Sequence, residues 1–167
     1  MMTSVFSDLS IGTEVAAIAA AAPADAAVTA NRAVYVPFVV NETVTVLKLW
    51  YYSGTGTGNS DIGIYNAAGT LLISSGPVAQ TASILVERDI ADTELTPGRY
   101  YLAWTADNAN THLTSTAVTQ AVGKALGLLQ STTASATLVT TPSWAVFGIN
   151  TGIPWMGIAM RTLVGAA

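Results

Sequence analysis

The stretch Arg99-Tyr100-Tyr101-Leu102-Ala103-Trp104-Thr105-Ala106 is the clearest strand signal in this chain of 167 residues. Tyr100, Leu102 and Trp104 occupy every second position, so they lie on one face of a β-strand. The segment Thr96-Pro97-Gly98-Arg99 before it predicts a type II turn, because Pro97 fixes φ and Gly98 accepts a positive φ. A strand entered through a tight turn indicates antiparallel β-structure.

Similar runs rich in β-branched and aromatic residues precede this strand. A type I turn followed by a left-handed glycine is predicted for Asn66-Ala67-Ala68-Gly69, which would form a hairpin. Ile62 and Ile64 share one face, whereas the apolar parity switches between Val46 and Leu47 and indicates a bulge or burial on both faces. Strands are predicted at Ala33–Val40, Thr43–Tyr52, Asp61–Tyr65, Leu71–Ser74, Ile84–Ile90 and Arg99–Ala106. We therefore expect an all-β protein, an antiparallel β-sandwich of jelly-roll type.

The two ends of the chain differ from this central part. Residues 1–31 are Ala-rich and form a predicted N-terminal arm, extended or with a short helix over Glu14–Ala22. The β-sandwich domain is expected over residues 32–167. Within it, helical spacing of apolar residues predicts one short helix near residues 117–130. The Ser/Thr/Ala stretch Ser131–Thr141 is predicted to be a loop, and closing strands are predicted at Trp144–Ile149 and Ile158–Leu163.

The chain carries few charges for its apolar content. It is 51% hydrophobic and 10% charged, with net charge −4, whereas ordinary soluble domains carry about 25% charged residues. Either the 23 Thr and 12 Ser supply the polar groups that hydrate the surface, or much of the surface is buried against neighbouring copies. The second alternative predicts an assembly subunit that forms a homo-oligomer.

Composition also excludes several classes of partner. The six basic residues are spread along the chain, so we expect no nucleic-acid binding, which needs clustered Lys and Arg. Pro23 and Asp25 cut the N-terminal apolar run below the roughly 20 residues of a membrane span. No basic residue precedes that run, so we expect neither a membrane segment nor a signal peptide, and synthesis in the cytoplasm.

No constellation of residues points to catalysis. The Gly-rich loop Ser53–Asp61 lacks the Lys-Ser/Thr ending of a phosphate-binding loop. The chain has no cysteine, and its single histidine, His112, cannot form a His-pair metal site. The acids between Glu87 and Glu94 are expected to solvate a connection between strands. We therefore expect no enzyme activity, no cofactor and no metal site.

Aromatic residues supply the candidate interface. In adjacent pairs such as Tyr51/Tyr52, strand geometry places one ring on each face of the sheet. One ring of each pair therefore faces solvent, a helix or a neighbouring subunit, and aromatic platforms of this kind can also bind sugars. The predicted interface residues are Val15, Ile18, Tyr51, Tyr101, Trp144 and Trp155.

The chain from Val34 to Trp104 resembles a known pattern. The segments that carry the resemblance are Val36-Pro37-Phe38-Val39-Val40, Val46-Leu47-Lys48-Leu49-Trp50, Asp61-Ile62-Gly63-Ile64-Tyr65 and Leu95-Thr96-Pro97-Gly98-Arg99-Tyr100-Tyr101-Leu102. They resemble jelly-roll domains in virion structural proteins of tailed bacteriophages, of the capsid decoration or head-fibre type. More distantly, they are similar to the pre-peptidase C-terminal β-sandwich domains of secreted bacterial enzymes. These segments cover under half of the chain and consist of structural residues.

The resemblance implies a non-enzymatic virion protein, most simply a capsid decoration subunit. Its expected partners are the major capsid protein or another virion protein and sister copies, with a trimer favoured. The alternatives are a carbohydrate-binding surface module and a phage tail or neck component.

Overall fold

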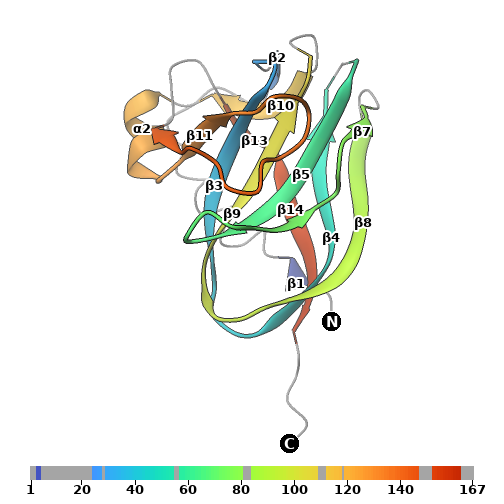
Figure 1. The fold of residues 1–167 in the computed structure, drawn as a ribbon, viewed down its shortest axis with the longest axis vertical. Helices are drawn as coiled ribbons and strands as arrows, with labels where there is room; N and C mark the ends of the chain where they lie inside the picture. Colours follow the sequence, from blue (N-terminus) through green and yellow to red (C-terminus); the bar gives the residue numbers. More distant parts are fainter. Residues whose placement is uncertain are drawn as a thin grey trace, which may run out of the picture.

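The computed structural model is a β-sandwich of two antiparallel sheets, as the sequence predicts (Figure 1). The structure describes residues 3–4, 24–27, 29–54, 57–80, 84–108, 112–117, 119–146 and 152–162. Sheet A contains β1 (Thr3–Ser4), β14 (Met156–Thr162), β4 (Val44–Ser53), β8 (Ile84–Leu95), β10 (His112–Ala117), β2 (Ala24–Ala27) and β13 (Gly152–Pro154). Sheet B contains β12 (Ala145–Val146), β11 (Leu129–Thr132), β3 (Arg32–Val40), β9 (Gly98–Ala106), β5 (Asn59–Asn66), β6 (Leu71–Ser74) and β7 (Val78–Ala79).

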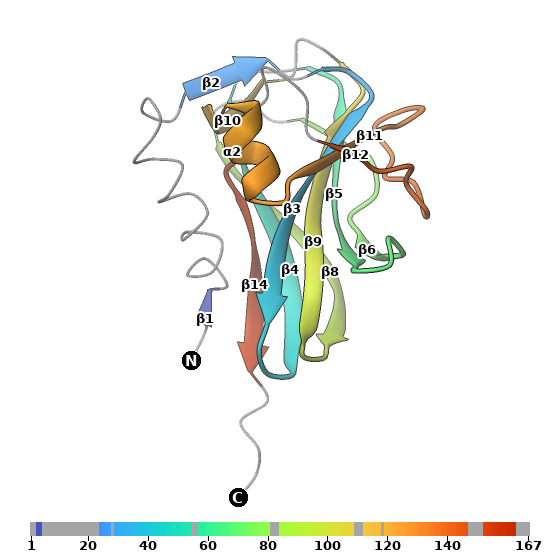
Figure 2. The ribbon, with the colours of Figure 1, turned by 90° about the vertical axis from the view of Figure 1, so that its left-hand side faces the viewer.

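Two strand pairs define the topology. β3 pairs with β9 in sheet B, and β4 pairs with β8 in sheet A. The β3–β4 and β8–β9 connections cross between the sheets at the same end, where Val40 pairs with Gly98 and Val44 with Leu95 (Figure 2). The two strand pairs thus form the two facing sheets of the sandwich.

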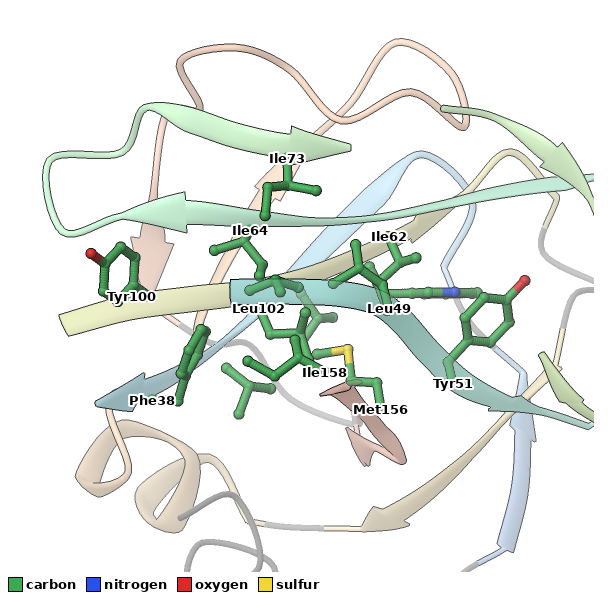
Figure 3. Packing of buried hydrophobic residues seen from close by; sticks show 14 of the residues in the cluster. Phe38, Leu49, Tyr51, Ile62, Ile64, Ile73, Tyr100, Leu102, Met156 and Ile158 are labelled. Atoms are coloured by element: carbon green, nitrogen blue, oxygen red, sulfur yellow. The ribbon is translucent and has the colours of Figure 1, made fainter. Parts of the chain in front are cut away.

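The core lies between the sheets (Figure 3). Tyr100, Leu102 and Trp104 of β9 face it together, and Ile62 and Ile64 of β5 join them, so both predicted alternations are confirmed. Sheet A contributes Leu49, Met156 and Ile158, among others. Burying each large apolar side chain of this kind contributes about 1.5–3 kcal/mol to folding.

The predicted irregularity at Val46 and Leu47 is a bulge. The register of β4 against β8 shifts between Val46 and Lys48, and the register of β14 shifts between the residues facing the same two positions. Leu47 therefore has no ladder partner on either side. The predicted hairpin turn is also confirmed, because Gly69 has φ 85° and its N–H donates to Asn66 O at 3.0 Å.

The predicted type II turn at Thr96–Arg99 is wrong. Among the described residues, Gly98 is not one of the glycines with positive φ. It begins β9 and pairs with Val40, so its backbone is set by the sheet ladder and not by the turn. The turn is therefore shorter than the sequence suggests.

The region after β9 differs most from the prediction. The helix is only α2 (Gln120–Ala125), with Thr119 as its N-cap. Gly127 has φ 73° and ends the helical turn, and the Leu128 N–H donates to Gly123 O at 3.0 Å. The chain then enters β11, which pairs with β3, so the first residues of the predicted loop 131–141 belong to a strand. No helix in the described residues is long and apolar enough to cross a membrane.

The Ala-rich segment supplies two strands to sheet A. β1 pairs with β14, and β2 pairs with β10. β10 itself was not predicted, because its sequence is short and rich in Ser and Thr. The described parts of the segment thus join the sheet of the same chain.

Candidate interface

Three of the exposed apolar side chains lie at one end of sheet A, whereas Val39 and Leu72 are exposed on sheet B. Leu85 of β8 is 49% exposed, and its partner across the ladder, Tyr52 of β4, is 38% exposed. Ile84, next to Leu85, is 47% exposed. We call Tyr52 and Leu85, which share the outer face, the sheet A patch; Ile84 pairs with the buried Ser53 and faces the other side of the sheet. Exposed apolar groups that lie together in this way are typical of interaction surfaces.

Trp155 lies beside the patch. Its backbone oxygen accepts a hydrogen bond of 2.9 Å from the Tyr52 N–H, and its side chain is half-buried. The structure therefore brings one of the predicted interface residues next to the exposed Tyr52. Trp50, two residues before Tyr52, packs its indole against Gly157 on the outer face of sheet A.

Tyr51 occupies a different position from the one predicted. Its ring is fully buried and packs edge-to-face on Trp104 in the core. Its hydroxyl lies 2.8 Å from Ser60 Oγ and 3.1 Å from Arg88 Nη2, so it links the two sheets. Tyr51 offers no surface to a neighbouring copy. Alternation alone could not reveal this, because it separates the two rings of a pair without saying which ring faces inward.

Tyr101 and Trp144 form a second small core on the outer face of sheet B. Tyr101 is buried, and its ring centroid lies 4.8 Å from that of Trp144. Trp144 also packs edge-to-face on Tyr35, with centroids 5.8 Å apart. The segment after β11 thus covers sheet B with the chain's own residues. Both rings pack within the subunit; Tyr101 is buried and offers little surface, whereas Trp144 is half-buried and its place in an interface stays a prediction.

Polar groups tie this covering segment to the sheet. The Tyr65 hydroxyl donates to Val139 O at 2.6 Å, and the Tyr35 hydroxyl lies 2.7 Å from Ser131 Oγ. Burial raises the pKa of both tyrosines above the usual value. Both groups therefore stay neutral at physiological pH and act as hydrogen-bonding structural residues.

Three sequence-predicted features remain to be placed. Val15 and Ile18 lie outside the described residues. His112 pairs through its backbone with Ala27. Among the described residues there is no group of three or more metal-ligating side chains.

Ile84 and Leu85 are exposed but are not among the predicted interface residues. The signal was present, because three successive apolar residues, Ile84-Leu85-Val86, cannot all face the core from one strand. Val86 is the buried one. Asp107, which follows β9, accepts hydrogen bonds from the Asn59 N–H at 2.9 Å and from Asn59 Nδ2 at 3.0 Å. These bonds lower the pKa of the Asp107 carboxyl below its usual value.

Comparison with known proteins adds no assignment. No family model, no curated protein and no solved structure matches this chain. The function must therefore be argued from the fold and from the surface described above.

Proposed function

We propose that this chain is a non-enzymatic assembly subunit, and specifically a virion structural protein of the capsid decoration type. The observation that supports it best is the sheet A patch, where exposed Tyr52 and Leu85 lie side by side and Tyr52 adjoins Trp155. Apolar and aromatic residues at the centre of a contact are typical of protein interfaces. On this proposal the patch docks on a sister copy or on the shell.

The virion part of the proposal has a narrower basis. It draws on the resemblance of residues 34–104 to phage jelly-roll proteins and on the β-sandwich fold. Jelly rolls occur in viral capsid proteins and in lectins, so the fold alone is an analogy and does not decide between them. Phage proteins of the resembling type are commonly trimers, and we propose a trimer here.

Light scattering of the purified chain tests the assembly proposal. We expect a stable oligomer that the double variant Tyr52→Ser, Leu85→Ser converts to monomer. A suitable control is Leu72→Ser, because Leu72 is 42% exposed on β6 of the other sheet. A wild-type chain that stays monomeric at high concentration contradicts the proposal.

The virion assignment requires its own test. We expect the gene to lie beside a major capsid protein gene, and the purified chain to co-sediment with shells assembled from that capsid protein. The Tyr52→Ser, Leu85→Ser variant should sediment with fewer shells. If the chain and the shells sediment separately, as each does alone, the decoration role is contradicted. A gene next to tail or neck genes favours the tail or neck alternative.

Carbohydrate binding is the second candidate, and one observation favours it. Trp50 and Tyr52 lie two residues apart on the outer face of β4, with the Lys48–Glu87 ion pair at 3.7 Å beside them. Aromatic faces with nearby polar groups can bind sugar rings. A glycan array with hits that Tyr52→Ala abolishes supports this candidate, and an array without hits rejects it.

A further inference from the structure

β8 is a long strand that is paired on one side. It spans Ile84–Leu95, and in the part of the chain that the structure describes it pairs with β4 alone. Figure 1 shows it along one flank of the sandwich. Alternate backbone N–H and C=O groups of such a strand point away from its partner, which makes the edge a template for an added strand.

The side chains of this edge are strongly acidic. Four of the ten Asp and Glu residues of the chain lie in β8, namely Glu87, Asp89, Asp92 and Glu94. Its one basic residue, Arg88, turns inward, where Nη2 donates to the Tyr51 hydroxyl at 3.1 Å. Arg88 therefore forms no ion pair with the carboxylates of its own strand.

Two of the four carboxylates already have partners from the sheet. Lys48 lies 3.7 Å from Glu87, and Arg161 lies 3.9 Å from Asp92. Asp89 and Glu94 are exposed, and no basic group of the described residues forms an ion pair with them. The open edge thus carries an unbalanced negative charge along its length.

This charge selects the occupant of the edge. A second β8 edge laid antiparallel against the first would place carboxylates close to carboxylates, and like charges across a ladder are destabilising. An added strand with Lys or Arg would meet opposite charges instead. At the start of β8, Leu85 on the outer face and Ile84 on the inner face would each lie beside a residue of the added strand.

We propose that the β8 edge binds an extended segment of a partner protein that carries Lys or Arg at alternate positions. The segment adds to sheet A as a strand, with backbone hydrogen bonds for affinity and Asp89 and Glu94 for selection. This inference rests on the proposed function in taking the chain to be a binding module, and it names the chemistry of one partner.

A synthetic peptide tests the proposal on the intact chain. The probe is a labelled ten-residue peptide of alternating Val and Lys, followed by fluorescence anisotropy. We expect it to bind, to weaken with added salt, and to bind more tightly than the matching Val–Glu peptide. A third peptide, with Pro for Val, retains the charge but loses the backbone donors, and should bind least of the basic probes.

Two double variants separate the effect of the β8 carboxylates on peptide binding from the effect of the chain's net charge. Asp89→Asn with Glu94→Gln raises the net charge by two and should weaken binding between about twofold and thirtyfold, because each exposed ion pair contributes about 0.2–1 kcal/mol. Thr132→Lys with Thr137→Lys also raises the net charge by two, at exposed positions outside sheet A, and should change binding less than twofold.

Hydrogen exchange then locates the added strand. We expect amides of β8 to gain protection with the Val–Lys peptide, whereas β14 amides do not. Equal binding of the Val–Lys and Pro–Lys peptides, or equal effects of the two double variants, overturns the proposal. Light scattering in the same samples keeps the two proposals apart: Leu85 belongs to both surfaces, so a chain that stays monomeric yet binds the Val–Lys peptide supports the edge and contradicts the assembly proposal.

Discussion

The backbone N–H of Leu138 donates a hydrogen bond of 3.0 Å to the Asp61 carboxylate, across 77 positions of sequence. Asp61 is fully buried on β5. The Ser74 hydroxyl lies 2.9 and 2.8 Å from its two oxygens, and the Ser75 hydroxyl donates at 3.1 Å. One carboxylate thus joins β5, the end of β6 and the segment that covers sheet B.

Replacing this carboxylate should destabilise the fold. We expect Asp61→Asn to lower the free energy of unfolding by about 1–3 kcal/mol, because the amide group turns a donor toward donors and leaves buried groups unpaired. Urea unfolding followed by tryptophan fluorescence measures the loss. The control Glu42→Gln, at an exposed loop residue, should stay within about 0.5 kcal/mol of wild type. Equal stability of both variants contradicts the structural role of Asp61.

Two glycines should respond in opposite ways to alanine. A Cβ on Gly63 would meet the backbone oxygen of Ile73 and come within 2.8 Å of Leu138 Cδ1, so Gly63→Ala should cost about 1–3 kcal/mol. A Cβ on Gly98 has its nearest neighbour at 3.5 Å, in Tyr100. Gly98→Ala should therefore be neutral or stabilise by up to about 1 kcal/mol. A large loss in Gly98→Ala would instead indicate a backbone there that requires glycine.

Acid sensitivity should depend on Asp107. Its bonds from Asn59 lower the folded-state pKa, so this carboxylate contributes stability above its unfolded pKa. That contribution disappears as the pH falls through the lowered folded pKa. We expect the melting temperature of wild type to fall more between pH 5 and about pH 2.5 than that of Asp107→Asn. Asn59→Ala removes the Nδ2 donor and keeps the backbone N–H, so NMR titration should show the Asp107 pKa moving part of the way back toward its usual value; an unchanged pKa contradicts a contribution from the side-chain bond.

Local patterns in the sequence were sufficient for much of the sandwich. Alternation placed Tyr100, Leu102 and Trp104 on the core face, and the parity switch at Leu47 located the bulge. These features depend on residues close in sequence. The prediction of a type II turn at Gly98 is wrong because Gly98 pairs with Val40, 58 positions earlier in the chain. This pairing sets the backbone conformation of Gly98.

Features that depend on distant pairing could not be read locally. β8 extends to Leu95 through polar, exposed residues because Val44 of β4 pairs with its last residue. β11 forms because β3 offers it an edge. The candidate interface was predicted least well. Alternation places adjacent aromatic rings on opposite faces of a strand, but it does not tell which of the two faces becomes the core.

Trp144 and Leu85 separate stability from association. Trp144 lies against Tyr101 and Tyr35, so Trp144→Ala should lower the free energy of unfolding by about 2–4 kcal/mol. This loss is smaller than the largest losses on replacing a fully buried Trp, because Trp144 is only half-buried. It should leave the association constant of the folded chain unchanged. Leu85→Ser should do the reverse, because Leu85 is 49% exposed and contributes little to the core. Denaturation and sedimentation of both variants check the pair, with Trp144→Phe as the control that retains a ring. If the Trp144→Ala variant is fully folded but associates more weakly than wild type, Trp144 belongs to the interface.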